Sequence, residues 1–299
     1  MSGLSSASSP LPPWDETDLV ALLSLETLGP MHYRNRFGDA NLNGRSYGGQ
    51  VLGQAMTAAA LSVADDRAAS AMQFLFLQGA MPDRPVDFHV TALQDGKRFS
   101  SRHVRAIQEG GRIVLDAQAT FALPMSGPSH AAVSAAAEPA PDRLPGLPEV
   151  PSAWQERLGQ LSGYSFSAKA AIDFRFADLE QVDPATGRPQ LRYWLKARHP
   201  LPAAPKVQVA AFAYLSDWWL NFSSFGCHVR GLAEGERLYV ASLNHCIWLH
   251  RPFRCDQWLH VESKSPGAQG GRGLSFASVH DADGVLVASL SQQSLMAHA

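Results

Sequence analysis

The chain has 299 residues, of which 45% are hydrophobic and 17% charged, and its formal net charge is -2. These values are typical of a globular protein with room for two ordinary domains, so they exclude a disordered chain and predict no nucleic-acid partner. No stretch approaches about 18 consecutive apolar residues, so we expect no membrane span. The three cysteines form no even-numbered framework, which favours a reducing, cytoplasmic setting.

Residues 1–13 lack the basic and apolar parts of a secretory signal and are predicted to form a disordered tail. The first half of the folded chain, residues 14–123, contains one apolar helix predicted over 49–63. The hydrophobic pattern of this half predicts strands at 32–36, 71–77, 86–93, 98–108 and 113–121.

Residues 124–154 are rich in Pro, Ala and Ser and show no periodicity, which predicts an extended linker over the surface. The second half, residues 155–299, repeats the order of the first half, with an apolar helix predicted over 207–220. Its predicted strands are 174–176, 191–197, 237–250, 258–265, 274–280 and 285–296. The pattern indicates an α+β fold in which two antiparallel sheets are each wrapped round a central helix. That is the hotdog plan, and two copies in one chain make a double hotdog.

The first helix carries two polar side chains, Gln50 and Gln54, that share a face. Gln54 is interpreted either as a hydrogen-bonding partner of the sheet or of the other helix, or as part of a site. Gly48 and Gly49 stand at the start of this helix. There they would let a ligand carbonyl approach the amide groups of the first turn.

Residues 241–253, A-S-L-N-H-C-I-W-L-H-R-P-F, are an apolar run with an unusual number of hydrogen-bonding groups. Each such group needs a partner when it is buried, so one face of this strand is expected to line a site. Strict alternation puts Ser242 and Asn244 on one face and His245 on the other.

Three polar residues of the second half stand where apolar ones are expected: Asp217, Ser242 and Gln292. Each alone is compatible with a structural role. Together, an acid and two neutral polar groups can hold one water molecule and direct it at a carbonyl carbon. The acid would take the proton, so this chemistry needs no cofactor and no metal.

The chain resembles the acyl-CoA thioesterase II family, a double-hotdog group, over about 14–297. The matching segments are S-Y-G-G-Q-V-L-G-Q-A (46–55), D-G-K-R-F-S-S-R-H-V-R-A-I-Q-E-G (95–110), Y-L-S-D (214–217), S-L-N-H-C-I-W-L-H-R-P-F (242–253) and D-G-V-L-V-A-S-L-S-Q-Q (283–293).

The resemblance implies hydrolysis of an acyl-CoA thioester to a free acid and CoA. It places the water-ordering Asp, Ser and Gln on Asp217, Ser242 and Gln292, and it implies a homo-oligomer. Backbone amides at Gly48 and Gly49 are the candidates for stabilising the oxyanion.

Three positions depart from the family pattern. Asn244 stands where the family usually has Asp, and Gln78 where it has Arg. Trp218 and Trp219 replace smaller residues after the acid, which predicts a narrowed or reshaped acyl pocket.

Four other functions remain open. A zinc site would have to use His245, Cys246, His250, Cys255 and His260, whose spacing matches no usual ligand pattern. A serine hydrolase lacks the G-x-S-x-G elbow. A hydratase motif is half matched at Asp39 and Asn41 but has Gly44 where His belongs. A non-catalytic acyl-CoA binding protein of the same fold is the main alternative.

Overall fold

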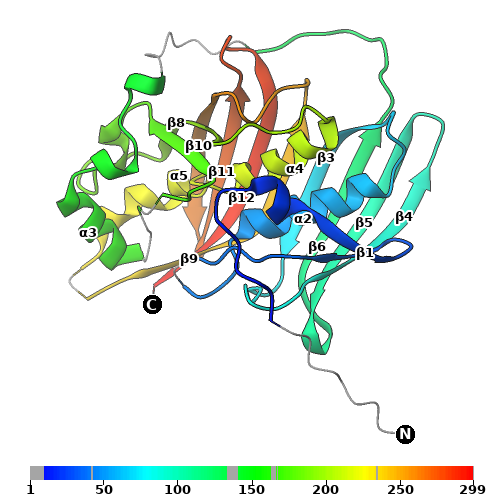
Figure 1. The fold of residues 1–299 in the computed structure, drawn as a ribbon. Helices are drawn as coiled ribbons and strands as arrows, with labels where there is room; N and C mark the ends of the chain where they lie inside the picture. The colour runs from blue at the N-terminus through cyan, green and yellow to red at the C-terminus, as the bar shows by residue number, and fades with distance from the viewer. Residues whose placement is uncertain are drawn as a thin grey trace, which may run out of the picture.

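The computed structural model describes residues 10–41, 43–132, 141–162, 166, 168–233 and 235–298. Within these residues the strands form one antiparallel sheet, and helices lie across one of its faces (Figure 1). The helices are α1 (Leu19–Leu23), α2 (Gly48–Leu61), α3 (Ser152–Ser162), α4 (Pro205–Ser216) and α5 (Phe222–Phe225). The strands of the first half are β1 (Leu25–Gly29), β2 (His32–Asn35), β3 (Ala68–Phe76), β4 (Asp87–Asp95), β5 (Phe99–Gln108) and β6 (Arg112–Ala122). Those of the second half are β7 (Ile172–Phe176), β8 (Gln190–Ala197), β9 (Leu238–Leu249), β10 (Leu259–Gln269), β11 (Arg272–His280) and β12 (Leu286–His298).

The sheet runs without a break through both halves, in the order β1-β2-β4-β5-β6-β3-β9-β12-β11-β10-β8-β7. Strands β3 and β9 join the halves, with Ala71 opposite Trp248 and Leu75 opposite Asn244. The sequence predicts two sheets, whereas the structure has one. The reason is that the edge strand of each half satisfies the backbone groups of the other.

Helices α2 and α4 pack against each other across the middle of the sheet (Figure 1). Both are apolar nearly all round because each contacts the sheet on one side and its partner helix on another. Two glycines of α2 allow the close approach. A Cβ at Gly53 would lie 2.9 Å from the Ala210 carbonyl oxygen, and one at Gly49 would collide with the Tyr214 carbonyl oxygen.

The predicted tail and linker are only partly separate from the folded body. Residues 1–9 and 133–140 lie outside the described residues. The Leu11 amide donates a hydrogen bond to the Asp83 carbonyl oxygen at 2.9 Å, and Pro13 forms a bridge with Gly38. Leu147 and Val150 are buried in the core, and α3 begins at Ser152. The end of the predicted linker is therefore packed onto the second half rather than extended over its surface, because its apolar side chains find a place in the core.

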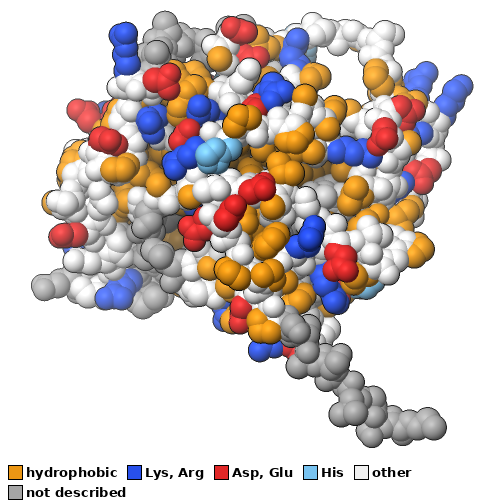
Figure 2. Space-filling model, in the orientation of Figure 1, with side chains coloured by type: hydrophobic (Ala, Val, Ile, Leu, Met, Phe, Trp, Pro, Cys, Tyr) orange, Lys and Arg blue, Asp and Glu red, His pale blue; other side chains and the backbone are white. Residues whose placement is uncertain are grey.

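No helix in the described part of the chain is long and apolar enough to cross a membrane. Figure 2 shows the helix-bearing face, where hydrophobic side chains gather near the middle and charged side chains of both signs surround them.

Candidate active site

Asp217, Ser242 and Gln292 meet at one point although they come from three separate elements. Gln292 Nε2 donates to Asp217 Oδ1 at 2.6 Å and to Ser242 Oγ at 2.8 Å. Ser242 Oγ lies 3.4 Å from the same Asp217 oxygen and donates to it. The structure thus brings together the three residues that the sequence selects, and it shows that the amide directs both of its N–H groups at the other two.

Asp217 is positioned by the end of helix α4. The sequence predicts a helix over 207–220, but α4 ends at Ser216 and Asp217 is its C-cap. Two residues later, Trp219 has a left-handed backbone with φ of 64°, which a helix cannot continue through. The Trp219 ring is 1% exposed and packs 5.1 Å from the Phe166 ring, so burial of this large side chain holds the turn in place.

A β-bulge positions Ser242. In the pairing of β12 with β9, Gln292 lies opposite His245 and Ser294 lies opposite Ser242, so Leu243 is the extra residue. Alternation alone would put Ser242 and His245 on opposite faces of the sheet. Because the bulge adds one residue, both face the helices, and Ser242 reaches Asp217.

The start of helix α2 lies directly against the Asp217 carboxylate. The Gly49 backbone N–H donates a hydrogen bond to this carboxylate, and a Cβ at Gly48 would collide with Asp217 Oδ2. Sequence reasoning assigned these glycines to the approach of a ligand carbonyl. The structure instead directs the Gly49 amide to the acid, where the positive end of a helix favours a negative charge.

Burial raises the pKa of Asp217 from 3.8 to about 7. Removal from water disfavours the charged form, and this effect is the largest one. Hydrogen bonds from Gln292, Ser242 and the Gly49 amide, together with the charge of Lys169, oppose it without cancelling it. The acid therefore changes its charge near neutral pH, which is the range that suits a general base.

An ion pair beside the acid was not predicted from the sequence. Lys169 Nζ lies 2.8 Å from Asp39 Oδ1, and the Tyr214 hydroxyl donates to Asp39 Oδ2 at 2.9 Å. The ammonium group also lies 4.5 Å from the centre of the Tyr47 ring, within range of a cation–π contact. Asp39 and Lys169 are 130 residues apart, so no local pattern could have signalled the pair.

Asp217 and Ser242 face a pocket of about 600 Å³ between the two halves, whereas Gln292 is fully buried and does not line it. Its wall includes Tyr47, Gly48 and Phe76 from the first half and Asp217, Trp218 and Ser242 from the second. Trp219 also contributes to the wall, although most of its ring is in the core. Both tryptophans that the sequence singles out therefore border the pocket.

Gln54 does not reach this pocket. Its Nε2 donates to the Leu22 carbonyl oxygen at 2.8 Å, and its Oε1 accepts from Gln50 Nε2 at 3.2 Å. Gln54 thus ties helix α2 to α1, an element that the sequence does not predict. Both ends of the Gln54 amide are engaged away from Asp217, although its partners are α1 and Gln50 and not the sheet or the other long helix that the sequence suggested.

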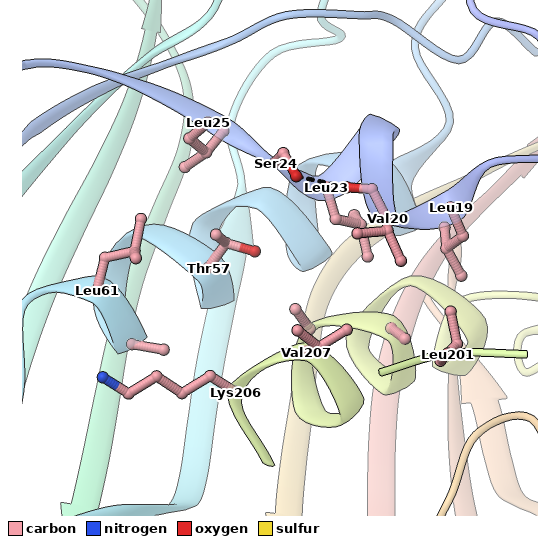
Figure 3. Close-up of a pocket in the computed structure, with 13 residues that line it drawn as sticks. Leu19, Val20, Leu23, Ser24, Leu25, Thr57, Leu61, Leu201, Lys206 and Val207 are labelled. Atoms are coloured by element: carbon pink, nitrogen blue, oxygen red, sulfur yellow. Dashed lines mark hydrogen bonds between the residues drawn. The ribbon is translucent and has the colours of Figure 1, made fainter. Parts of the chain in front are cut away.

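A second pocket, of about 260 Å³, lies between α1, α2 and α4 (Figure 3). It is lined mainly by aliphatic side chains, and its one charged residue, Lys206, extends along its rim. Lys206 Nζ is bound to Asp65 Oδ1 at 2.7 Å and to the Val63 carbonyl oxygen at 3.0 Å. No carboxyl group of the described residues lines this pocket, so it does not share the arrangement found in the larger one.

The proposed zinc ligands do not gather in the structure. His245 binds Ser216 on the inner face of the sheet, whereas Cys255 Sγ donates to the Gln208 carbonyl oxygen and His260 stacks on Trp194. Among the described residues one other group, His32, Asp87 and His89, has closely spaced ligand atoms. Two observations show that this group does not fit a metal ion.

Arg34 donates to both oxygens of Asp87, at 2.6 and 2.8 Å, so the charge of this carboxylate is already paired with a guanidinium. The rings of His32 and His89 are stacked with centroids 4.2 Å apart and an interplanar angle of 22°. Nitrogen lone pairs lie in the ring plane, so those of two stacked rings do not converge on one ion.

Comparisons with known proteins agree with this architecture. Residues 38–122 match the model of the acyl-CoA thioesterase N-terminal domain, and residues 139–296 match that of the C-terminal domain. Acyl-CoA thioesterase 2 of Haemophilus influenzae is 29% identical over 93% of this chain and 96% of its own. Acyl-coenzyme A thioesterase 8 of Mus musculus is also 29% identical, over 93% of this chain and 88% of its own.

Solved structures are similar over nearly the whole chain. Acyl-CoA thioesterase II TesB2 from Mycobacterium marinum has a TM-score of 0.74 and 31% identity, covering 94% of this chain and 97% of its own. A hotdog-fold protein from Alicyclobacillus acidocaldarius has a TM-score of 0.70 at 16% identity, covering 93% and 97%. The fold and the position of the site thus define a hotdog-fold protein. More closely, the chain belongs to the acyl-CoA thioesterase II family.

Proposed function

We propose that this chain hydrolyses acyl-CoA thioesters to a free acid and CoA, with Asp217 as the general base. The observation that carries the proposal is the convergence of Gln292 and Ser242 on one oxygen of a buried carboxylate whose pKa is about 7. A water molecule at this point would find an acceptor in the carboxylate and a polar partner in the Ser242 hydroxyl, while the Gln292 amide holds both groups in place. The names of the relatives supply the substrate class, acyl-CoA.

The reaction balances without a covalent enzyme intermediate. Asp217 takes one proton from the water, and the resulting hydroxide forms a bond to the thioester carbonyl carbon. The tetrahedral intermediate collapses by breaking the carbon–sulfur bond, and the proton on Asp217 passes to the leaving sulfur. The backbone amide of Gly48 is the remaining candidate for binding the oxyanion, because the Gly49 amide is directed to Asp217.

Ser242 is a positioning group in this proposal, not a nucleophile. A serine nucleophile needs a base that accepts its proton, usually a histidine. The buried histidine on the same strand, His245, is hydrogen-bonded to Ser216 instead. Among the residues that the structure describes, the one acid hydrogen-bonded to Ser242 is Asp217, at 3.4 Å, and Gln292 donates to Ser242 at 2.8 Å. This arrangement suits a hydroxyl that orients a water.

We also propose that the chain is a double hotdog and that it forms a homo-oligomer. We assign the chain to the double hotdog because each half contributes six strands and one long apolar helix. A homo-oligomer is supported by three large apolar side chains, Leu75, Trp248 and Phe276, which are 38–49% exposed on strands β3, β9 and β11. Sedimentation of the purified chain tests the oligomer. The cytoplasmic setting stays a prediction, supported by three free cysteines.

Release of free thiol from a panel of acyl-CoAs of different chain lengths tests the reaction. We expect turnover by the wild type, no measurable turnover by Asp217→Asn, and a fall in kcat of about 10²-fold or less for Ser242→Ala. Asp116→Asn is the matched control, since Asp116 pairs with His103 away from the pocket and should leave kcat unchanged. Binding of acyl-CoA without turnover at any chain length would instead show a non-catalytic binding protein.

A further inference from the structure

His245 lies next to the proposed catalytic residues, and the reaction above gives it no role. Its side chain is fully buried on the inner face of β9, and its register partner on β12 is Gln292, which is also fully buried. Residues paired across antiparallel strands have Cβ atoms about 4.5–5.5 Å apart. The imidazole and the Gln292 amide are therefore immediate neighbours.

The hydrogen bonds of Ser216 determine where the proton of His245 resides. Ser216 Oγ donates its only proton to the Ala213 carbonyl oxygen at 3.0 Å. With that proton assigned to the Ala213 carbonyl oxygen, the same Ser216 oxygen accepts at its 2.9 Å contact with His245 Nε2. Burial lowers the pKa of His245 to about 3, so the ring is neutral with its proton on Nε2. The other ring nitrogen, Nδ1, is an acceptor.

The orientation of the Gln292 amide is fixed by its other contacts. Its NH₂ group faces Asp217 and Ser242, because the opposite orientation would place Oε1 2.6 Å from a carboxylate oxygen. Gln292 Oε1 is then an acceptor that points away from them. Both Gln292 Oε1 and His245 Nδ1 are buried, and neither has a donor among the described residues.

We propose that His245 is a positioning residue that holds the Gln292 amide through one buried water, which donates to both His245 Nδ1 and Gln292 Oε1. Two acceptors cannot bond to each other, whereas a water has two protons to give, and buried waters usually occupy sites of this kind. The water holds the amide with its NH₂ group toward Asp217 and Ser242, the orientation that the hydrolytic step uses. This inference rests on the proposed function.

Two amide substitutions separate the ring nitrogens of His245. In His245→Asn the amide lies where Nδ1 is, so an acceptor for the water remains while the Ser216 contact is lost. In His245→Gln the amide lies where Nε2 is, so the Ser216 contact remains while the acceptor is lost. We expect His245→Asn to keep kcat within about 3-fold, and His245→Gln to lose about 10- to 100-fold in kcat with KM nearly unchanged.

His280→Gln is the matched control, because His280 is also buried with an Nδ1 that lacks a partner among the described residues, but it lies on β11. It should leave kcat unchanged. Equal losses in both His245 variants, or a larger loss in His245→Asn, would show that His245 acts only through Ser216 and would overturn the proposal.

A high-resolution crystal structure of the wild type tests the water directly and needs no variant to fold. An ordered water within hydrogen-bond distance of both atoms is expected, and clear density that excludes one would refute the inference. The two proposals fail separately. Full activity of His245→Gln beside an inactive Asp217→Asn refutes only the role of His245, whereas full activity of Asp217→Asn refutes the proposed function.

Discussion

Replacing Asp217 by Asn should stabilise the protein more at high pH than at low pH. The carboxyl has a pKa of 3.8 in ordinary surroundings and about 7 in the folded protein, because burial disfavours its charge. The folded state thus binds this proton more tightly than the unfolded state. Below about pH 4, Asp217 therefore does not affect the free energy of unfolding of the wild type. This free energy falls as the pH rises from about 4 to 7, and above about pH 7 it stays lowered by the full amount.

One pKa unit corresponds to 1.36 kcal/mol, so the shift of about 3 units amounts to roughly 4 kcal/mol at about pH 8.5. At about pH 4.5 the corresponding cost is about 1 kcal/mol. The amide side chain of the Asp217→Asn variant does not titrate in this pH range. Its free energy of unfolding relative to wild type should therefore rise by about 3 kcal/mol between the two pH values.

Urea unfolding followed by tryptophan fluorescence, at both pH values and for both proteins, measures this difference. Any fixed cost of the amide, such as an imperfect hydrogen bond to the Gly49 N–H, is the same at both pH values and cancels. Groups elsewhere in the protein titrate alike in wild type and variant, and they cancel too. A stability difference that does not change with pH would refute the reasoning, because it would mean that Asp217 is not held in a state that resists ionisation.

Three further predictions follow from the contacts of the site. The kcat/KM of the wild type should fall about tenfold per pH unit below about pH 7, because the base must be ionised; a profile flat down to about pH 5 would contradict this. Gly48→Ala should lower kcat by at least about 10²-fold while circular dichroism stays unchanged, because the added methyl collides with Asp217 Oδ2. Gln54→Met should lower the free energy of unfolding by about 1–3 kcal/mol, since the Leu22 carbonyl oxygen loses its donor, and kcat should stay the same. A changed kcat in that variant would indicate that Gln54 does act in the site.

The elements with strong local patterns were predictable from the sequence. The two apolar helices and most of the strands lie within a few residues of their expected positions, because the helices are apolar nearly all round and many strands alternate buried with less buried residues. Asp217, Ser242 and Gln292 were also predictable, since each is a polar residue in an apolar context within a recognisable motif. The positions of these helices, strands and polar residues are therefore set by neighbours that are close along the chain.

Features set by distant residues were not predictable. The bulge at Leu243 depends on how β9 pairs with β12, and it reverses the side on which periodicity places Ser242. The Lys169–Asp39 ion pair joins two loops that are 130 residues apart in the sequence. Gln54 was considered for the site because α1, which supplies its partner, is too short to give a helical pattern. The merging of two sheets into one depends on which strands are left at the edges, and no single segment encodes that.

The Asp217 carboxylate belongs to the second half of the chain, whereas the glycines that enclose it belong to the first half. A protein expressed as two fragments, cut in the connecting segment, would have the base on one piece and its enclosure on the other. Hydrolysis would return only when the fragments rejoin through strands β3 and β9, so turnover would serve as a direct reporter of fragment complementation. Under the proposed function, neither half expressed alone would hydrolyse a thioester.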